Sequence, residues 1–419
     1  MSRAEIRHVP LSDASSWLKS MKSTFMEDPK LDFTEAQQAW WASIWDSERI
    51  RGGYADGRWV ATLRTFPTVL TVPDGARGTA EIAADALTQV TVAATHRRQG
   101  LLRGMLTASL EDAKERGEVV SILRAAEWTI YGRYGYWPST LGCDYQVVLA
   151  GNGAAIERPA GFDVRQIDPA EVIKYQSDVY DRMRVRRAGH IQRTDAMRRR
   201  ALGLDGLKSR YGREPICVIA TAANGQVDGT LWWMAKDGNF FDGKLDIEVL
   251  DLTAATDDAY QALWHYVLNI DLSATAGYRE RAVDEQLEWL LTDGRIARRQ
   301  RTWDDVWLRM LDVPAALSAR RYAATDRLVL DVVDSDTGGY GQGRVTLDGG
   351  PDDAECTATP TATADLRLSQ RALAAVYLGG HSLTSQVWAG YVDEESPGAL
   401  DRFAVMLRTD QPPWNATGF

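Results

Sequence analysis

The sequence predicts an α+β protein of three consecutive units, of which the second repeats the first. Three observations lead to this prediction. A short β-branched strand ending at Ala93-Ala94-Thr95 leads into an amphipathic helix at 101–116. A similar strand end at 252–256, again followed by a helix, occurs later in the chain. From about Arg301 a new order begins, in which several strands precede two helices.

In the first unit, apolar alternation and turn residues predict the elements in order. Glu5–Val9 is a strand, and Ser12 is placed to cap a helix that runs to about Met21. A second helix, rich in tryptophan, covers Glu35–Trp45. The other expected elements are strands at Arg51–Tyr54, Arg58–Val72, Ala80–Ile82 and Val119–Arg124, a hairpin turn at Ala55–Gly57, and a short helix or turn at Trp128–Tyr131.

Turn formers at Gly151-Asn152-Gly153 interrupt the pattern and mark a boundary. The predicted domains are therefore 1–150, 151–299 and 300–419. After the boundary we expect a strand at Phe162–Ile167, a helix that starts at Asp168-Pro169 and a hairpin at Asn224-Gly225-Gln226. In the third unit the expected strands are Val306–Asp312, Leu328–Val333, Gly343–Leu347, Thr357–Ala362 and Leu366–Leu368, with helices at Pro314–Arg320, Gln370–Leu378 and Gly398–Leu407 and a hairpin loop at Gly338–Gly343.

Composition narrows the class of protein. A chain of 419 residues is too long for one core, and its 45% hydrophobic and 25% charged content is that of a globular protein. The net charge of −10 argues against a nucleic-acid partner and suits an amine-bearing substrate, although surface acidity can also serve solubility alone. Three scattered cysteines and five histidines predict neither disulfides nor a metal site. With no signal peptide and no long apolar run, we expect no membrane contact and a cytoplasmic location.

An anion site is predicted where the strand at 87–95 meets its helix. Arg97, Arg98 and Gly100 lie at the helix N-terminus, where backbone N–H groups are unpaired and the helix dipole is positive. Gly100 allows close backbone approach, and the arginines add charge-assisted donors. The alternative is an ordinary strand-to-helix turn with a solvated basic cap.

These residues resemble a known cofactor loop. The pattern V-x-V-x-x-x-H-R-R-x-G-L-L is similar to the acetyl-CoA pyrophosphate loop of the GNAT acyltransferases, and Tyr131–Tyr136 resembles their Y-x-R-F-G-Y segment. The spacing of the two motifs and the ending Pro412-Pro413-Trp414 to Phe419 resemble the Eis (enhanced intracellular survival) N-acetyltransferases over the whole chain. The resemblance implies acetyl-CoA as co-substrate, no metal, and coenzyme contacts at Val90, Thr91, Val92, Arg97, Arg98, Gln99, Gly100, Leu101 and Leu102.

The same resemblance implies two tandem GNAT-like domains followed by a sterol-carrier-like domain. The segment Trp307–Tyr322 resembles the start of that last domain. In the second domain Asp257 and Asp258 stand at the helix start, and Asp258 and Gln261 are matched to Arg97 and Gly100. Carboxylates there repel a pyrophosphate, so this domain is expected to have lost its coenzyme loop.

Two residues are expected to move protons. Tyr131 is the candidate general acid, because a phenol of pKa about 10 is matched to the departing thiolate; the alternative is that it packs in the core, as Tyr134 and Tyr136 are expected to do. In Eis-like enzymes the terminal carboxylate, here that of Phe419, is the base. Partial burial or a bridging water would make an α-carboxylate basic enough. Without the resemblance, a terminus docked only for stability is favoured.

The acceptor amine is expected to contact acidic and aromatic side chains near the N-terminus. The candidates are Phe25, Glu27, Asp28, Trp40 and Trp41, each of which could instead be core or solvated surface. The arginine run from Arg184 to Arg200 is interpreted as a solvated helix face, with a subunit contact as the alternative.

Together these observations predict a cytoplasmic acetyl-CoA-dependent N-acetyltransferase that acts on primary amines of a small, aminoglycoside-like molecule. A protein lysine N-acetyltransferase and a lipid or sterol carrier are the alternatives. The resemblance implies a homohexamer.

Overall fold

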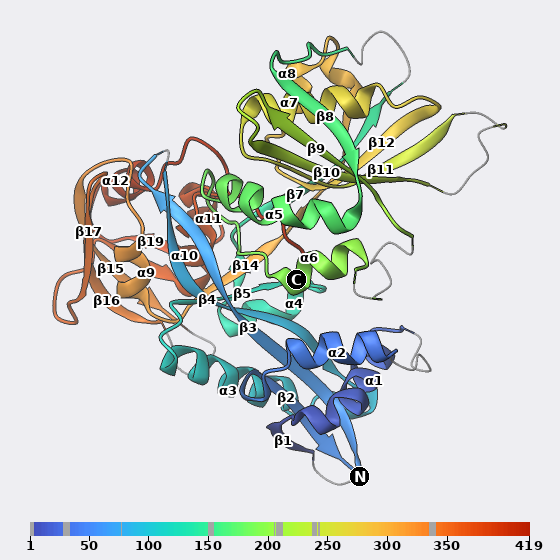
Figure 1. Cartoon of the computed structure of the whole chain (residues 1–419). Helices are drawn as coiled ribbons and strands as arrows, with labels where there is room; N and C mark the ends of the chain where they lie inside the picture. Colours follow the sequence, from blue (N-terminus) through green and yellow to red (C-terminus); the bar gives the residue numbers. More distant parts are fainter. Residues whose placement is uncertain are drawn as a thin grey trace.

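The chain is described by a computed structural model for residues 4–27, 34–76, 78–149, 155–204, 206, 213–236, 241, 244–334 and 341–419. It contains three β-sheets, each the centre of one domain (Figure 1). The N-terminal domain is blue to cyan, the second green to yellow, and the third orange to red. Two domains of the same architecture followed by a smaller one are what the sequence predicts.

The first sheet has seven strands in the order β1-β2-β3-β4-β5-β14-β6. Trp59 and Val60, neighbours on β3, belong to different hydrophobic clusters, one beneath α1 and α2 and the other beneath α3, because successive strand residues face opposite sides. The elements are β1 (Glu5–His8), α1 (Ala14–Thr24), α2 (Glu35–Ser43), β2 (Ile50–Ala55), β3 (Arg58–Asp74), β4 (Gly78–Val92), α3 (Leu101–Glu115), β5 (Val120–Arg124), α4 (Trp128–Tyr131), β6 (Trp137–Pro138) and, from much later in the chain, β14 (Val306–Met310).

Local signals explain most of these boundaries. The hairpin between β2 and β3 turns at Asp56 and Gly57, both with positive φ, as predicted. Thr34 and Gln37 form a capping box at the start of α2. The expected cap Ser12 lies inside a 3-10 turn, and Asp13 takes the N-cap position of α1 instead. The strand expected at Ala80–Ile82 is part of the long strand β4.

The second sheet repeats the order of the first as β8-β9-β10-β11-β12-β7-β13. In both sheets the fourth and fifth strands pair in parallel, β4 with β5 and β11 with β12. The elements are β7 (Leu141–Val148), β8 (Phe162–Ile167), α5 (Pro169–Arg184), α6 (Asp195–Leu202), β9 (Ile216–Ala222), β10 (Val227–Ala235), β11 (Leu245–Ala254), α7 (Asp257–Leu268), β12 (Ser273–Arg281), α8 (Leu287–Leu290) and β13 (Ala297–Asp304).

Two strands pair across the predicted domain boundaries. Strand β7 comes before position 150 but pairs with β12 and β13 in the second sheet. Strand β14 comes after position 300 but pairs with β5 in the first sheet. The turn formers at 151–153 lie outside the described residues. Each of the first two sheets is therefore completed by a strand from beyond its predicted segment.

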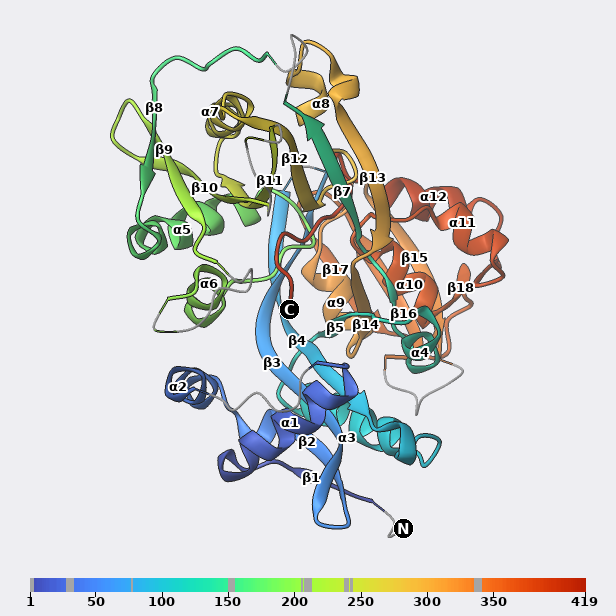
Figure 2. The ribbon, with the colours of Figure 1, turned by 90° about the vertical axis from the view of Figure 1, so that its right-hand side faces the viewer.

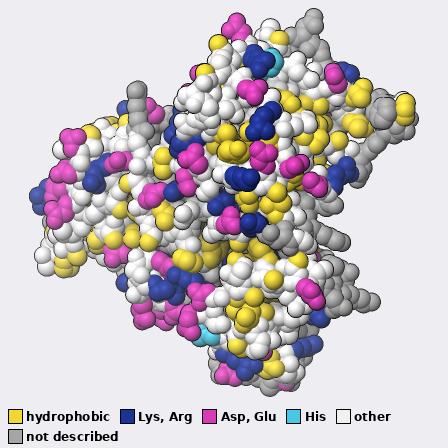
Figure 3. All heavy atoms as spheres, in the orientation of Figure 1, with side chains coloured by type: hydrophobic (Ala, Val, Ile, Leu, Met, Phe, Trp, Pro, Cys, Tyr) yellow, Lys and Arg dark blue, Asp and Glu magenta, His cyan; other side chains and the backbone are white. Residues whose placement is uncertain are grey.

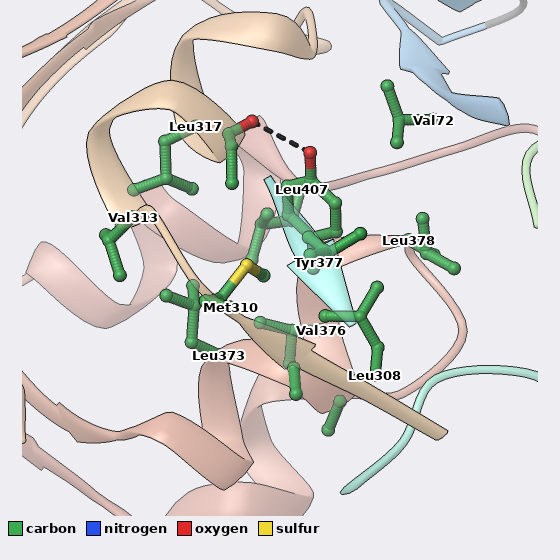
Figure 4. Close-up of a cluster of buried hydrophobic side chains, with 14 of the residues drawn as sticks. Val72, Leu308, Met310, Val313, Leu317, Leu373, Val376, Tyr377, Leu378 and Leu407 are labelled. Atoms are coloured by element: carbon green, nitrogen blue, oxygen red, sulfur yellow. Dashed lines mark hydrogen bonds between the residues drawn. The ribbon is translucent and has the colours of Figure 1, made fainter. Parts of the chain in front are cut away.

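The third domain is a five-stranded sheet, β17-β16-β15-β18-β19, with four helices. Its interior is filled by side chains, and Tyr377 donates its hydroxyl to the carbonyl of Ala316 at 2.8 Å within that cluster (Figure 4). Of the glycine-rich stretch, 338–340 lie outside the described residues. The elements are α9 (Val313–Ala319), β15 (Asp326–Val333), β16 (Gly343–Gly349), β17 (Ala354–Ala358), β18 (Leu366–Ser369), α10 (Gln370–Tyr377), α11 (Leu383–Trp388), β19 (Val392–Glu394) and α12 (Ala399–Met406).

Three details of this domain differ from the sequence prediction. Strand β17 begins at Ala354 rather than Thr357, and α11 and β19 were not predicted because each is too short to show a period. No helix in the described part of the chain is long and apolar enough to cross a membrane. On the face shown in Figure 3, acidic and basic side chains lie interspersed.

Candidate active site

The first sheet opens between β4 and β5. The two strands pair in parallel as far as Leu87 and Leu123 and then diverge. A bulge follows on β4, where Gln89 has a φ of 57° and the register against β3 shifts. Thr62 secures the bulge by donating its hydroxyl to the carbonyl of Gln89 at 2.7 Å. Among the described strands, none pairs with Val90–Val92 on the side that faces the opening.

The N-terminus of α3 is open beside this strand end. Gly100 is its N-cap with a φ of 81°, and no side chain of the described residues caps the helix. A Cβ at Gly100 would meet nothing within 4 Å, and Arg97, Arg98 and Gln99 are exposed around it. Free first-turn N–H groups and two guanidinium groups fit a pyrophosphate, so the predicted coenzyme loop has the arrangement that the chemistry needs.

Tyr131 lies beside the opening on the same side of the sheet as α3. It ends α4 and is 8% exposed, in one cluster with Leu87 and Leu123. Its ring packs edge to face with that of Tyr136, with centroids 6.2 Å apart. Burial first, and the charge of Glu127 second, raise the pKa of Tyr131 to about 12. Tyr134 and Tyr136 are buried, as expected.

The third domain holds the turn that carries Tyr131. Arg371 of α10 donates Nε to the carbonyl of Gly132 at 2.8 Å. Arg309 of β14 donates to the carbonyl of Tyr134 and pairs with Asp334 at 3.0 Å. Gly135 permits this approach, because a Cβ there would collide with the guanidinium of Arg309. Two arginines from outside the first segment thus fix the backbone that follows Tyr131.

On the other side of the sheet, a cavity of about 690 Å³ reaches the same opening. Leu87 faces α3, so its neighbour Thr88 faces away from it and lines the cavity together with Gln89. Side chains of α2, α6 and β3 form the walls. The remaining lining that matters here is Trp40, Trp41, Arg64, Phe66, Arg124, Arg193, Arg198, Arg200, Asp251, Glu280 and the chain end from Ala416 to Phe419.

The chain ends in this cavity, where all three domains meet (Figure 2). The ring of Phe419 packs edge to face on Phe66, with centroids 5.9 Å apart. Arg193 holds the preceding residues by donating to the carbonyl of Ala416 at 2.6 Å and to the hydroxyl of Thr417 at 2.9 Å. The last residue therefore stands next to the opened sheet.

Of the five expected acceptor-binding residues, the structure brings two to the cavity. Trp40 and Trp41 line it. Phe25 follows α1 and is 44% exposed, and neither it nor Glu27 is among the lining residues. Asp28 lies outside the described residues. The sequence analysis missed Arg64 and Phe66. The one available signal was the charge of Arg64 inside an otherwise apolar strand.

Comparisons with known proteins agree with this geometry. Family models for an acetyltransferase (GNAT) domain match residues 5–138 and 189–313, and a sterol carrier protein domain matches 313–416. An N-acetyltransferase of Streptomyces griseus is 36% identical over 98% of both chains. N-acetyltransferase Eis of Mycobacterium tuberculosis is 30% identical over 88% of both chains. The chain belongs to the Eis family of N-acetyltransferases. The crystal structure of Eis1 from Mycobacterium abscessus superposes with a TM-score of 0.83 at 27% identity, covering 99% of this chain and all of that one.

As an Eis-family protein, the chain is an acetyltransferase whose GNAT fold implies acetyl-CoA as co-substrate. Its second GNAT domain lacks the coenzyme loop. The connection from β11 to α7 is only Ala255 and Thr256, and Thr256 caps α7 by accepting from Ala259 N at 3.2 Å. The residue matching made from the sequence was wrong here, because Gln261 lies inside α7 and the structural counterpart of Gly100 is Thr256. The loop is absent rather than replaced.

In this Eis-family chain the tail occupies the corresponding opening of the second sheet. Strands β11 and β12 pair as far as Val249 and Tyr278. Just beyond, Trp414 donates Nε1 to the carbonyl of Glu280 at 2.9 Å, and its ring lies 4.2 Å from the guanidinium of Arg281. The second domain therefore binds the C-terminal tail, whose last residues lie in the cavity beside the first sheet.

Several side chains of the run from Arg184 to Arg200 form ion pairs or bind the C-terminal tail, so its interpretation as a solvated helix face was wrong. Arg184 is 8% exposed and pairs with Asp181 at 2.7 Å. Arg187 donates to the carbonyl of Pro412 at 2.6 Å, and Arg193 pairs with Asp251 at 2.9 Å. Several of these side chains bind tail residues, whose proximity no local sequence pattern reveals.

Proposed function

We propose that this protein transfers the acetyl group of acetyl-CoA to a primary amine of a small molecule that enters the 690 Å³ cavity. One observation supports this most: the uncapped N-terminus of α3 and the cavity lie on opposite sides of the sheet and approach the same opening between β4 and β5. Donor and acceptor would meet there.

Acetyl-CoA supplies an activated acetyl group on sulfur. The N–H groups of β4 beyond Leu87 orient its carbonyl. The amine nitrogen forms the new bond to the acetyl carbon as the carbon–sulfur bond breaks. Tyr131 donates its phenolic proton to the departing sulfur, and its raised pKa keeps that proton available at neutral pH.

The base in this proposal is the terminal carboxylate of Phe419, which takes the proton of the attacking amine. Phe419 is only partly exposed and packs on Phe66. Removing a carboxylate from water raises its pKa and so its strength as a base.

The cavity supports a small-molecule acceptor over a protein lysine, because side chains of two helices and the chain's own tail line it and restrict its width. The carrier alternative is disfavoured by the third domain's interior, which is packed with side chains such as Leu317, Leu373 and Tyr377 (Figure 4). The family resemblance implies aminoglycosides as one class of small-molecule acceptor.

A screen of amines with acetyl-CoA tests the proposed function. Release of the thiol is followed with a thiol-detecting reagent, and mass spectrometry of the acceptor identifies the acetylated amine. We expect release that depends on the amine. Its absence with every class of small amine, alongside acetylation of a lysine peptide, would replace the small molecule by a protein.

We also propose a homohexamer in the cytoplasm. Trp289 and Trp388 are 83% and 89% exposed, as side chains at a subunit contact would be in a separated chain. Cys143, Cys217 and Cys356 are free thiols, which a reducing compartment preserves. Light scattering should give about six times the chain mass of 46.5 kDa; the mass of one chain at working concentration would refute the assembly.

A further inference from the structure

The cavity that receives the acceptor carries more basic than acidic side chains. Five arginines line it, but only two carboxylate side chains do. Both of those are already paired: Asp251 with Arg193 at 2.9 Å, and Glu280 with Arg124 at 3.2 Å. The terminal carboxylate adds one negative charge. The balance differs from the acidic cavity that a polycation such as an aminoglycoside requires.

Arg64 lines the cavity without forming an ion pair among the described residues. Within the described residues no carboxylate lies within ion-pair distance of it, and its one hydrogen bond is a long contact of 3.5 Å from Nη2 to the carbonyl of Ile44. The nearby acid Asp46 pairs with Arg49 at 3.6 Å and acts on Arg64 only beyond ion-pair distance. Because a guanidinium has five N–H donors, most of those of Arg64 remain available to a ligand.

Two aromatic rings flank this guanidinium in the cavity wall. Its Cζ lies 5.7 Å from the ring of Trp41 and 5.6 Å from that of Phe66. Burial and the charge of Arg200 lower the pKa of Arg64 to about 10, so the group stays charged at neutral pH. Cation–π contacts with ring faces do not use the N–H donors of a guanidinium, which can still hydrogen-bond to a ligand.

Three buried polar atoms in the lining have no hydrogen-bond partner among the described residues. They are two donors, Nε of Arg198 and Nε1 of Trp232, and one acceptor, Oε1 of Gln89. Buried polar atoms are usually paired, and unpaired ones in a cavity indicate a polar ligand. Arg198 and Arg64 offer donors, whereas Gln89 offers an acceptor at the opening where the amine must react.

We infer that the acceptor is a small molecule with an anionic group, a carboxylate or a phosphate, besides its primary amine, and that Arg64 binds the anionic group. Arg64 is paired with Thr88 in the β3–β4 ladder. Paired residues share a face with Cβ atoms about 5 Å apart, so the anion would bind close to the opening. This inference rests on the proposed function and names its substrate class.

Matched acceptors test the inference in the full-length protein. The pairs are glucosamine with glucosamine 6-phosphate, and tryptamine with tryptophan, while kanamycin and spermidine represent polycations. We expect a kcat/KM for the anionic member of at least one pair about tenfold or more above its neutral partner and above both polycations. Which pair shows the difference tells phosphate from carboxylate.

Variants assign the effect to Arg64. R64Q should lower kcat/KM for the preferred anionic acceptor by about tenfold to a hundredfold, mainly through KM, and should change kcat/KM for the partner without the anionic group far less. R64K keeps a charge and should retain part of the preference. Arg402→Gln, which alters an exposed ion pair on α12, is the control and should change neither.

The outcomes separate the two proposals. Equal rates within both pairs, or a higher kcat/KM for kanamycin or spermidine, would overturn the anionic acceptor while leaving acetyl transfer to small amines intact. A preference that survives in R64Q would also overturn the assignment to Arg64. If no amine at all is acetylated, the proposed function falls and the inference falls with it.

Discussion

At the scale of single residues, Tyr131 shows how surroundings change what a side chain can do. It is 8% exposed next to the place where β4 and β5 separate, and its pKa is raised to about 12 by burial. A phenol with that pKa stays protonated at neutral pH, so it holds a proton to donate and cannot accept one, although it is a weaker acid than a free tyrosine. The environment therefore suits an acid better than a nucleophile-activating base.

Tyr131→Phe tests this role. The variant keeps the ring and its packing but loses the proton, so turnover should fall by about 10² or more while acetyl-CoA affinity stays the same. In the wild type, the raised pKa keeps the acid protonated through pH 10, so Tyr131 should cause no loss of kcat between pH 8 and 10. A steady-state pH profile and calorimetry measure both. Near-normal turnover in the variant would assign the proton to another group.

At the same scale, what the sequence could predict depended on how local the signal was. Arg97, Arg98 and Gly100 were found because they follow one another between a strand and a helix. Arg64 and Arg193 were missed as site residues because their partners, Trp41 and the tail, are distant in sequence. A charge in an apolar strand or in a basic run does not by itself reveal what it faces.

At the scale of elements, α3 and α7 are corresponding helices of the two GNAT domains, and their N-termini differ in capping and charge. No side chain in the described residues caps α3, whereas Thr256 caps α7 and Arg186 pairs with Asp257 at 2.8 Å. A capped and acidic N-terminus offers neither free N–H groups nor positive potential to a phosphate. Acetyl-CoA should therefore bind only the first domain.

Reversal of Arg97 and Arg98 to glutamate tests this. The double variant should lose measurable acetyl-CoA binding by calorimetry, because two repulsive charges replace two exposed donors at the anion site. Its circular dichroism should be unchanged, since neither side chain is buried. Reversing Arg186, at the corresponding end of α7, is the matched control and should leave affinity intact. Unchanged affinity in the folded double variant would contradict the site.

The element that follows Tyr131 depends on the third domain. Arg371→Gln removes the 2.8 Å hydrogen bond to Gly132, so the turn should become less well fixed and kcat should fall about tenfold. Arg371 is a positioning residue, and KM for acetyl-CoA should therefore not change. Arg402→Gln, in the same domain, serves as the control. A rise in KM with unchanged kcat would show that Arg371 acts on binding instead.

At the scale of the whole molecule, the sequence predicted three domains and their order but not their interdependence. Periodicity predicts a strand at Val306–Asp312 without showing which sheet it joins, and the strand that became β7 was not predicted. The pairings of β7 and β14 are long-range, and that of β14 ties the first sheet to the third domain. Tyr131, the proposed general acid, and Arg309, which binds the turn after it, both depend on that arrangement.

The C-terminal tail is the subject of the last prediction, which concerns deletion of Phe419. Residues before Phe419 are anchored independently of it, by the bond of Trp414 to Glu280 and by Arg193. Deleting Phe419 alone should therefore leave the tail seated, the fold intact and acetyl-CoA binding unchanged. Turnover should nevertheless fall sharply, because the carboxylate of the new end would stand one residue short of the opening.

Extending the chain beyond Phe419 with a short tag separates the carboxylate from the ring. The extension keeps the contact of Phe419 with Phe66 but converts the terminal carboxylate to an amide, which cannot accept the amine's proton. Turnover should fall as in the deletion, and proteolytic removal of a tag that leaves no residues should restore it. Acetylation of the best acceptor at the normal rate by the extended protein would show that Phe419 contributes packing alone. The extended protein keeps the ring of Phe419 but lacks its carboxylate, so the carboxylate could not be the base.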